Sequence, residues 1–150
     1  MHKIIIYKPG KYQVVLSRTG QEAELVGRFH IGGNDIKRWD IEIIHAAPKT
    51  QSRTNIKGVV DGDGQAFVNG TIKVLPAAVG TNAFLEERIL LLSPNSKAEA
   101  IPNLEIKTDD VKCSHAATIG KIDEEEIFYL QSRGISDKQA KEMIVEGFLR

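Results

Sequence analysis

Short apolar stretches separated by Gly, Pro, Asn, Asp and Ser fill the chain up to about residue 120. They recur at intervals of roughly a dozen residues, and none continues with a helical period. The pattern therefore predicts a series of short β-strands. The stretches lie at residues 4–7, 14–16, 25–29, 39–45, 56–60, 66–74, 89–92 and 104–106.

Two of these stretches alternate in the way that strands with one buried face do. The predicted inward sets are Trp39, Ile41, Ile43 and His45 in one, and Ala66, Val68, Ile72 and Val74 in the other. An antiparallel sandwich with tight hairpins would give this rhythm, and the Asp-Gly pairs of residues 61–64 suit such a hairpin. A solenoid that stacks each strand on the one before gives it equally well, so the period alone leaves both open.

The pattern changes to helical after Gly120. Asp123 is a suitable N-cap, Glu126 is placed to reach back to it, and Gly134 is a natural stop, which predicts a helix over residues 123–133. A second helix follows from the capping box that Ser136 forms with Gln139. Ile135 is expected to pack on the first turn of an apolar stripe made of Ala140, Met143, Ile144, Gly147 and Phe148.

Composition and charge argue against several classes of function. With 41% hydrophobic and 27% charged residues, the 150-residue chain is long enough for one globular domain with a continuous core. Its 20 basic and 20 acidic residues cancel, so we expect no nucleic-acid partner. The apolar run at residues 4–6 is far shorter than a signal peptide or the roughly 20 residues of a membrane span, so we expect a cytoplasmic protein without membrane association.

Cys113 and His115 are the candidate metal ligands. In an extended strand, residues two apart lie on the same face about 6.6 Å apart, so a thiolate and an imidazole could lean toward one ion. Two ligands are half of a tetrahedral set, and the others would come from another segment or subunit. On spacing alone, a small buried cysteine beside a hydrogen-bonded histidine is the commoner case.

Other polar residues fit structural roles better. His30 and His45 have no neighbouring residues that complete a ligand set, so we interpret both as structural histidines. Asp61 and Asp63 lack the glycine and glutamate positions of a calcium loop and fit a solvated turn. No phosphate-binding glycine loop, nucleophile elbow or metal-binding helix motif is present, so nothing indicates an enzyme.

Four ordered segments carry a recognisable pattern, at residues 90–93, 102–106, 109–120 and 127–135, with further matches at residues 45–48, 57–59 and 67–74. Together they resemble the SufB/SufD family of iron-sulfur cluster assembly proteins, and the Cys-Ser-His stretch at residues 113–115 looks more like SufD than SufB. The similarity extends from about residue 25 to residue 150 and is strongest after residue 88.

This resemblance implies a mostly β fold, a right-handed parallel β-helix over residues 1–120 that continues into a short two-helix segment over residues 121–150, as one continuous domain. It implies a non-enzymatic scaffold subunit on which a transient iron-sulfur cluster forms, with Cys113 and His115 near the contact with a SufB-like subunit or with a second copy. It also implies that a SufC-like ABC ATPase, which would hydrolyse ATP, docks near the helices, at Phe128, Tyr129, Arg133 and Gly134.

Three departures from the family pattern qualify these expectations. Ala116 stands where the family usually has glycine, which changes the backbone freedom next to His115. The chain lacks the helical N-terminal region and early turns of typical members, so we expect a minimal form or a fragment whose first turn needs a cap or a partner. No second cysteine is present to accept sulfur as SufB does.

Two other functions remain open. A minimal β-solenoid adaptor or structural protein of the same family would keep the fold and bind no cluster. A small metal-binding or thiol enzyme would rest on Cys113 and His115 alone, and it would need a lowered thiol pKa and a substrate cleft.

Overall fold

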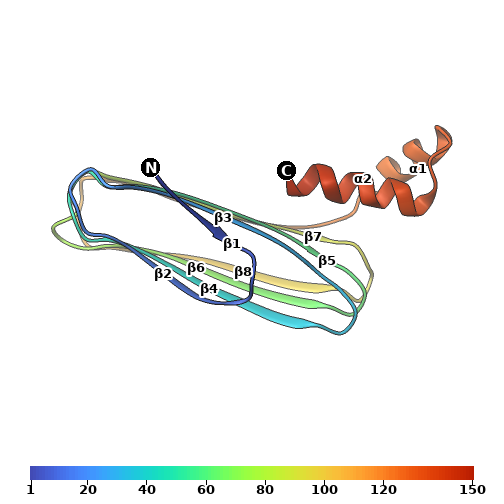
Figure 1. The fold of residues 1–150 in the computed structure, drawn as a ribbon, viewed down its shortest axis with the longest axis horizontal. Helices are drawn as coiled ribbons and strands as arrows, with labels where there is room; N and C mark the ends of the chain where they lie inside the picture. Colours follow the sequence, from blue (N-terminus) through green and yellow to red (C-terminus); the bar gives the residue numbers. More distant parts are fainter.

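The chain forms an elongated stack of strands with a helical hairpin against one side, as Figure 1 shows. The computed structural model describes residues 1–150. In order, the elements are β1 (His2–Ile6), β2 (Gly10–Leu16), β3 (Glu22–Ile31), β4 (Ile36–His45), β5 (Gln51–Val60), β6 (Gln65–Val74), β7 (Thr81–Leu91), β8 (Lys97–Ile106), β9 (Val111–Lys121), α1 (Glu124–Ser132) and α2 (Asp137–Leu149).

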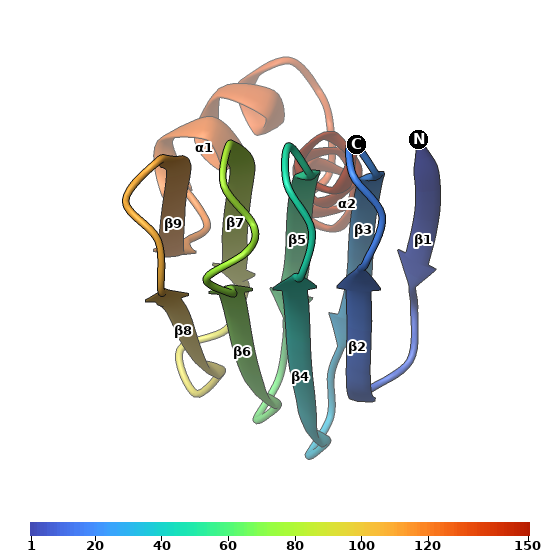
Figure 2. The same cartoon turned by 90° about the vertical axis from the view of Figure 1, so that its left-hand side faces the viewer.

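Successive strands belong alternately to two sheets, and all strands within each sheet are parallel. One sheet has the order β1-β3-β5-β7-β9 and the other β2-β4-β6-β8, so the chain winds around a common interior (Figure 2). This parallel solenoid of about four turns, followed by two helices, confirms the predicted β-helix and excludes the sandwich. Residues 61–64 accordingly link β5 to β6 in different sheets and do not form a hairpin.

Alternate side chains of each strand fill the interior, as the two alternating stretches predicted. Trp39, Ile41 and Ile43 of β4 are at most 2% exposed, and the inward apolar residues of β6 are fully buried. The Trp39 ring stacks on Phe29 of β3 with centroids 4.0 Å apart. Side chains from opposite sheets thus meet in one continuous core.

His45 lies in a fully hydrogen-bonded corner of this core, where it is completely buried. Its Nδ1 is 2.8 Å from Thr50 Oγ1, and its Nε2 is 2.9 Å from Ser52 Oγ. Because the Thr50 hydroxyl donates to Ala47 O, the network assigns the ring proton to Nδ1, and Ser52 donates to Nε2. Burial lowers the pKa of His45 to about 4, so a neutral structural histidine occupies this corner.

Capping by nearby residues determines where the two helices begin and where the first one ends. The Asp123 side chain accepts from Glu125 N at 2.8 Å, and Gly134 adopts a φ of 87° just after α1. The expected reciprocal hydrogen bond between the Glu126 side chain and the Asp123 backbone is not formed, so this part of the prediction is wrong. The short Asp123 carboxylate caps the second amide of the helix, and Glu126 stays exposed. The capping box of Ser136 at α2 is confirmed in both directions.

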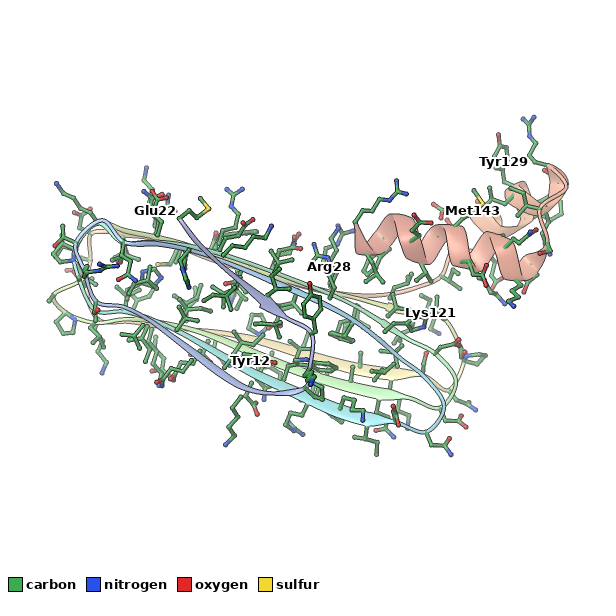
Figure 3. All side chains as sticks on the ribbon, viewed as in Figure 1. Tyr12, Glu22, Arg28, Lys121, Tyr129 and Met143 are labelled. Atoms are coloured by element: carbon green, nitrogen blue, oxygen red, sulfur yellow. The ribbon has the colours of Figure 1, made fainter.

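A column of three cations on the outer face of the larger sheet holds the C-terminal end of α2. Arg28 pairs in register with Lys57, and Lys57 with Arg88. Arg28 Nε donates to Leu149 O at 2.7 Å, and Figure 3 shows Arg28 below the end of the helix. Arg88 and Lys57 lie 5.5 and 6.0 Å from the Phe148 ring centroid. These cations complement the negative end of the helix dipole and fix the hairpin against the sheet.

Neither helix is long and apolar enough to cross a membrane.

Candidate functional site

The last turn of the solenoid leaves one end of the interior open. β9 pairs only with β7, and β8 pairs only with β6, so each has an edge without a neighbouring strand (Figure 2). The inward side chains of these two strands are half-buried or exposed, whereas the equivalent positions of β6 and β7 are buried. Free strand edges and uncovered interior side chains are features of a surface that receives another chain.

Cys113 and His115 both face this open end. Cys113 pairs with Ala83 and His115 with Leu85, and both of those β7 residues point into the core. The structure therefore places the thiol and the imidazole on one face of β9, at positions two residues apart along the strand. Cys113 is half-buried and His115 is exposed, so the histidine is the more accessible of the two.

The electrostatics of the pair favour a protonated thiol in the free chain. Burial raises the pKa of Cys113, and a backbone hydrogen bond with Ala83 partly offsets this. A metal ion would have to displace the thiol proton, because the thiolate is the ligand. No group of three or more His, Cys, Asp or Glu side chains that could hold a metal ion is formed within the chain. The pair thus supplies an incomplete ligand set.

Glu87, which the sequence patterns did not single out, lies inside the solenoid one turn below this end. Its side chain is 0% exposed and neither carboxyl oxygen has a hydrogen-bond partner. Burial raises its pKa to about 8, so the group is mostly protonated at neutral pH. The signal was present in the alternation of Ala83, Leu85 and Ile89, which puts Glu87 on the inward face.

The predicted docking residues form a second region on the helices. Phe128 and Tyr129 of α1 are 73% and 57% exposed, and the Arg133 guanidinium lies 5.2 Å from the Tyr129 ring centroid. Figure 3 shows Tyr129 pointing away from the solenoid. Since Cys113 is near the start of β9 and α1 follows its end, the strand separates the two regions by roughly 25 Å.

The sequence matches the SUF system FeS cluster assembly SufBD core domain over residues 9–148. It is 40% identical over 114 residues to the iron-sulfur cluster assembly protein SufD of Escherichia coli, an alignment covering 76% of this chain and 26% of SufD. It is 35% identical over 143 residues to a SufBD family protein of Mycobacterium leprae, covering 90% of this chain and 36% of that protein. A SufBD family protein of Mycobacterium bovis is 34% identical over 138 residues, covering 87% of this chain and 35% of that protein. The chain spans between about a quarter and about a third of the length of these curated relatives.

Proposed function

The chain belongs to the SufBD family of the SUF system for iron-sulfur cluster assembly, and on that basis we propose that it is a scaffold subunit on which a cluster forms transiently. The cluster is the cargo of the subunit, and Cys113 and His115 are two of its ligands. The subunit itself catalyses no reaction.

The observation that carries this proposal is the place of the two ligands on an edge strand. A strand of a SufB-like subunit, or of a second copy of this chain, can add to the free edge of β9 and cover both side chains. The partner then supplies the ligands that this chain lacks. A set divided between two chains keeps the cluster labile, because separation of the chains removes part of the coordination.

The α1–α2 hairpin is proposed to dock a SufC-like ABC ATPase. Phe128 and Tyr129 are large aromatic side chains left in solvent, and such residues supply much of the binding energy in protein interfaces. Arg133 extends this surface over the Tyr129 ring, and Gly134 sets the turn that orients the hairpin. ATP hydrolysis belongs to the partner.

The alternative is a minimal β-solenoid adaptor or structural protein of the same family that binds no cluster. Two observations favour it: the raised pKa of the Cys113 thiol and the incomplete ligand set within the chain. It differs from the scaffold function in one respect that can be measured, which is whether iron and sulfide are retained when a partner is bound.

An anaerobic co-expression pull-down with the organism's SufB-like and SufC-like proteins tests the proposal. Retained partners, iron and acid-labile sulfide are measured for the wild type, Cys113→Ser and His115→Ala. Ser114→Ala is the matched control, because Ser114 lies between the two ligands and faces the other side of β9. We expect partner capture in all four, with iron and sulfide lost only from the two ligand variants.

If the two ligand variants retain as much iron as the wild type, the scaffold function is contradicted and the adaptor function is the one that remains. Failure to capture either partner would overturn the scaffold proposal. The double variant Phe128→Ser/Tyr129→Ser separates the two contacts, since it is expected to lose the ATPase and keep the SufB-like subunit.

A further inference from the structure

Glu87 is an unpaired carboxylic acid in the interior of the solenoid. Its carboxyl group reaches across from β7 toward β6, where a Cβ at position 70 would collide with Glu87 Oε1 and lie 2.6 Å from Leu85 Cδ2. Gly70 therefore provides the space that the carboxyl group occupies. Ile56 of β5 and Ala117 of β9 pair in register with Glu87, and Ile41 of β4 and Pro102 of β8 pair in register with Gly70. None of these four side chains has a hydrogen-bonding or ionisable group.

This arrangement is unfavourable for the stability of the fold. A buried polar group without a partner lacks the hydrogen bonds it made to water, and the raised pKa of Glu87 expresses the same penalty. A leucine or glutamine would fill the space without an ionisable group. Unfavourable ionisable groups concentrate at functional sites, where their chemistry compensates for the lost stability.

Only one layer of small side chains separates Glu87 from the open end. Ala117 of β9 lies next to Glu87 in register, and Pro102 of β8 lies next to Gly70. Neither has a side-chain donor that could satisfy the carboxyl group. Ala117 is exposed and is two residues from His115 on the same inward face. His115 is therefore the nearest ionisable neighbour of Glu87 on the inner face of β9.

Glu86 shows what an ordinary carboxylate on this strand does. It points outward, and its Oε2 accepts a hydrogen bond from Asn55 Nδ2 at 2.5 Å. The two glutamates are adjacent in sequence, share one strand and differ in the face they occupy. Glu86 is accordingly the matched control for any test of Glu87.

We propose that Glu87 is an oxygen ligand that binds ferrous iron together with His115 at the open end of the solenoid. The inference rests on the proposed scaffold function, because a partner that covers this end supplies the remaining ligands. The carboxylic acid releases its proton to solvent as the carboxylate binds the metal, and no oxidation state changes. Oxygen and nitrogen ligands suit ferrous iron before sulfide arrives, so this pair would hold the incoming metal and Cys113 would join as the cluster forms.

Calorimetric titration with ferrous iron under anaerobic conditions tests this role. The full chain is titrated alone and with the SufB-like partner, near pH 7, in two buffers with different ionisation enthalpies so that protons released per iron are counted. We expect Glu87→Gln to bind iron at least about tenfold more weakly and to release about one proton fewer, and Glu86→Gln to match the wild type. Since Glu87→Gln conserves size and removes the ionisable group, circular dichroism should show it folded.

The outcomes separate this inference from the proposed function. Unchanged affinity and proton release in Glu87→Gln, with weakened binding in His115→Ala, would remove Glu87 from the site and leave the scaffold proposal standing. If the wild type binds no iron either alone or with the partner, both fall together.

Discussion

Two ionisable side chains are completely buried in this solenoid, and they differ in whether the surrounding residues hydrogen-bond to them. His45 lies at the end of β4 and both its ring nitrogens have hydroxyl partners, whereas Glu87 lies in the middle of β7 and its carboxyl oxygens have none. Both are 0% exposed. Burial is therefore the same at the two positions, and the number of hydrogen-bond partners is what differs between them.

The two residues also make the stability of the fold depend on pH in opposite directions. The folded pKa of His45 is lowered from 6.5 to about 4, so the unfolded chain takes up the proton first and stability falls on acidification across that window. The folded pKa of Glu87 is raised from 4.5 to about 8, so the unfolded chain loses the proton first and stability falls on alkalinisation. Each effect can be removed by one substitution.

The largest expected effect is that of Glu87→Gln at alkaline pH. The linkage relation gives a gain in the free energy of unfolding of roughly 4 kcal/mol at pH 8, and almost none at pH 4. Urea unfolding of the wild type and the variant across this range measures it. A variant that keeps the wild-type pH slope would show that Glu87 is ionised or paired in the folded protein.

His45→Leu should give the next largest change. Leucine has a similar volume but leaves the Thr50 and Ser52 hydroxyls without their ring partners, so we expect a loss of about 2–4 kcal/mol at pH 7. The variant should also lose the part of the acid-side slope between pH 6.5 and about 4 that His45 contributes. His30→Leu, at an exposed position, is the control and should stay within about 0.5 kcal/mol. Equal effects of the two variants would contradict the structural role of His45.

Gly70→Ala should give the smallest of the three changes, a destabilisation of about 1–3 kcal/mol from overpacking against Glu87 and Leu85. Removal of the longer side chain in Glu87→Ala/Gly70→Ala should restore part of this loss in a double-mutant cycle. Gly147→Ala, on α2 with nothing within 4 Å of the added Cβ, is the control and should not destabilise the fold. Additive effects of the substitutions at positions 70 and 87 would mean that the two residues do not contact.

Local features of this fold were predictable and its long-range pairings were not. The helix limits at Asp123, Gly134 and Ser136 follow from capping chemistry within a few residues. Strand period alone left sandwich and solenoid open, because the choice depends on which distant strand lies alongside, and only the family resemblance favoured the solenoid. The strand period was enough to predict that Cys113 and His115 lie on the same face of β9. Their role as metal ligands stays a prediction.

Glu87 was missed for a related reason. The apolar stretch recognised in this region began at Ile89, while β7 begins at Thr81, since its first half has polar residues that mask the alternation. The partners of His45 were equally hidden, because Thr50 and Ser52 reach it only after the chain has turned the corner. For Glu87 the information lies in the alternation within β7 itself, and for the partners of His45 it lies in the register between turns.

That register has a consequence for how the length of such a chain can change over evolution. Leu25 pairs with Thr54, and Thr54 with Leu85, although the two intervening segments differ in length. The corners between strands absorb the difference, so residues can be gained or lost there without moving any column of side chains. One residue inserted within β7 would exchange its inner and outer faces as far as the next corner, and would put Glu86 where Glu87 now lies.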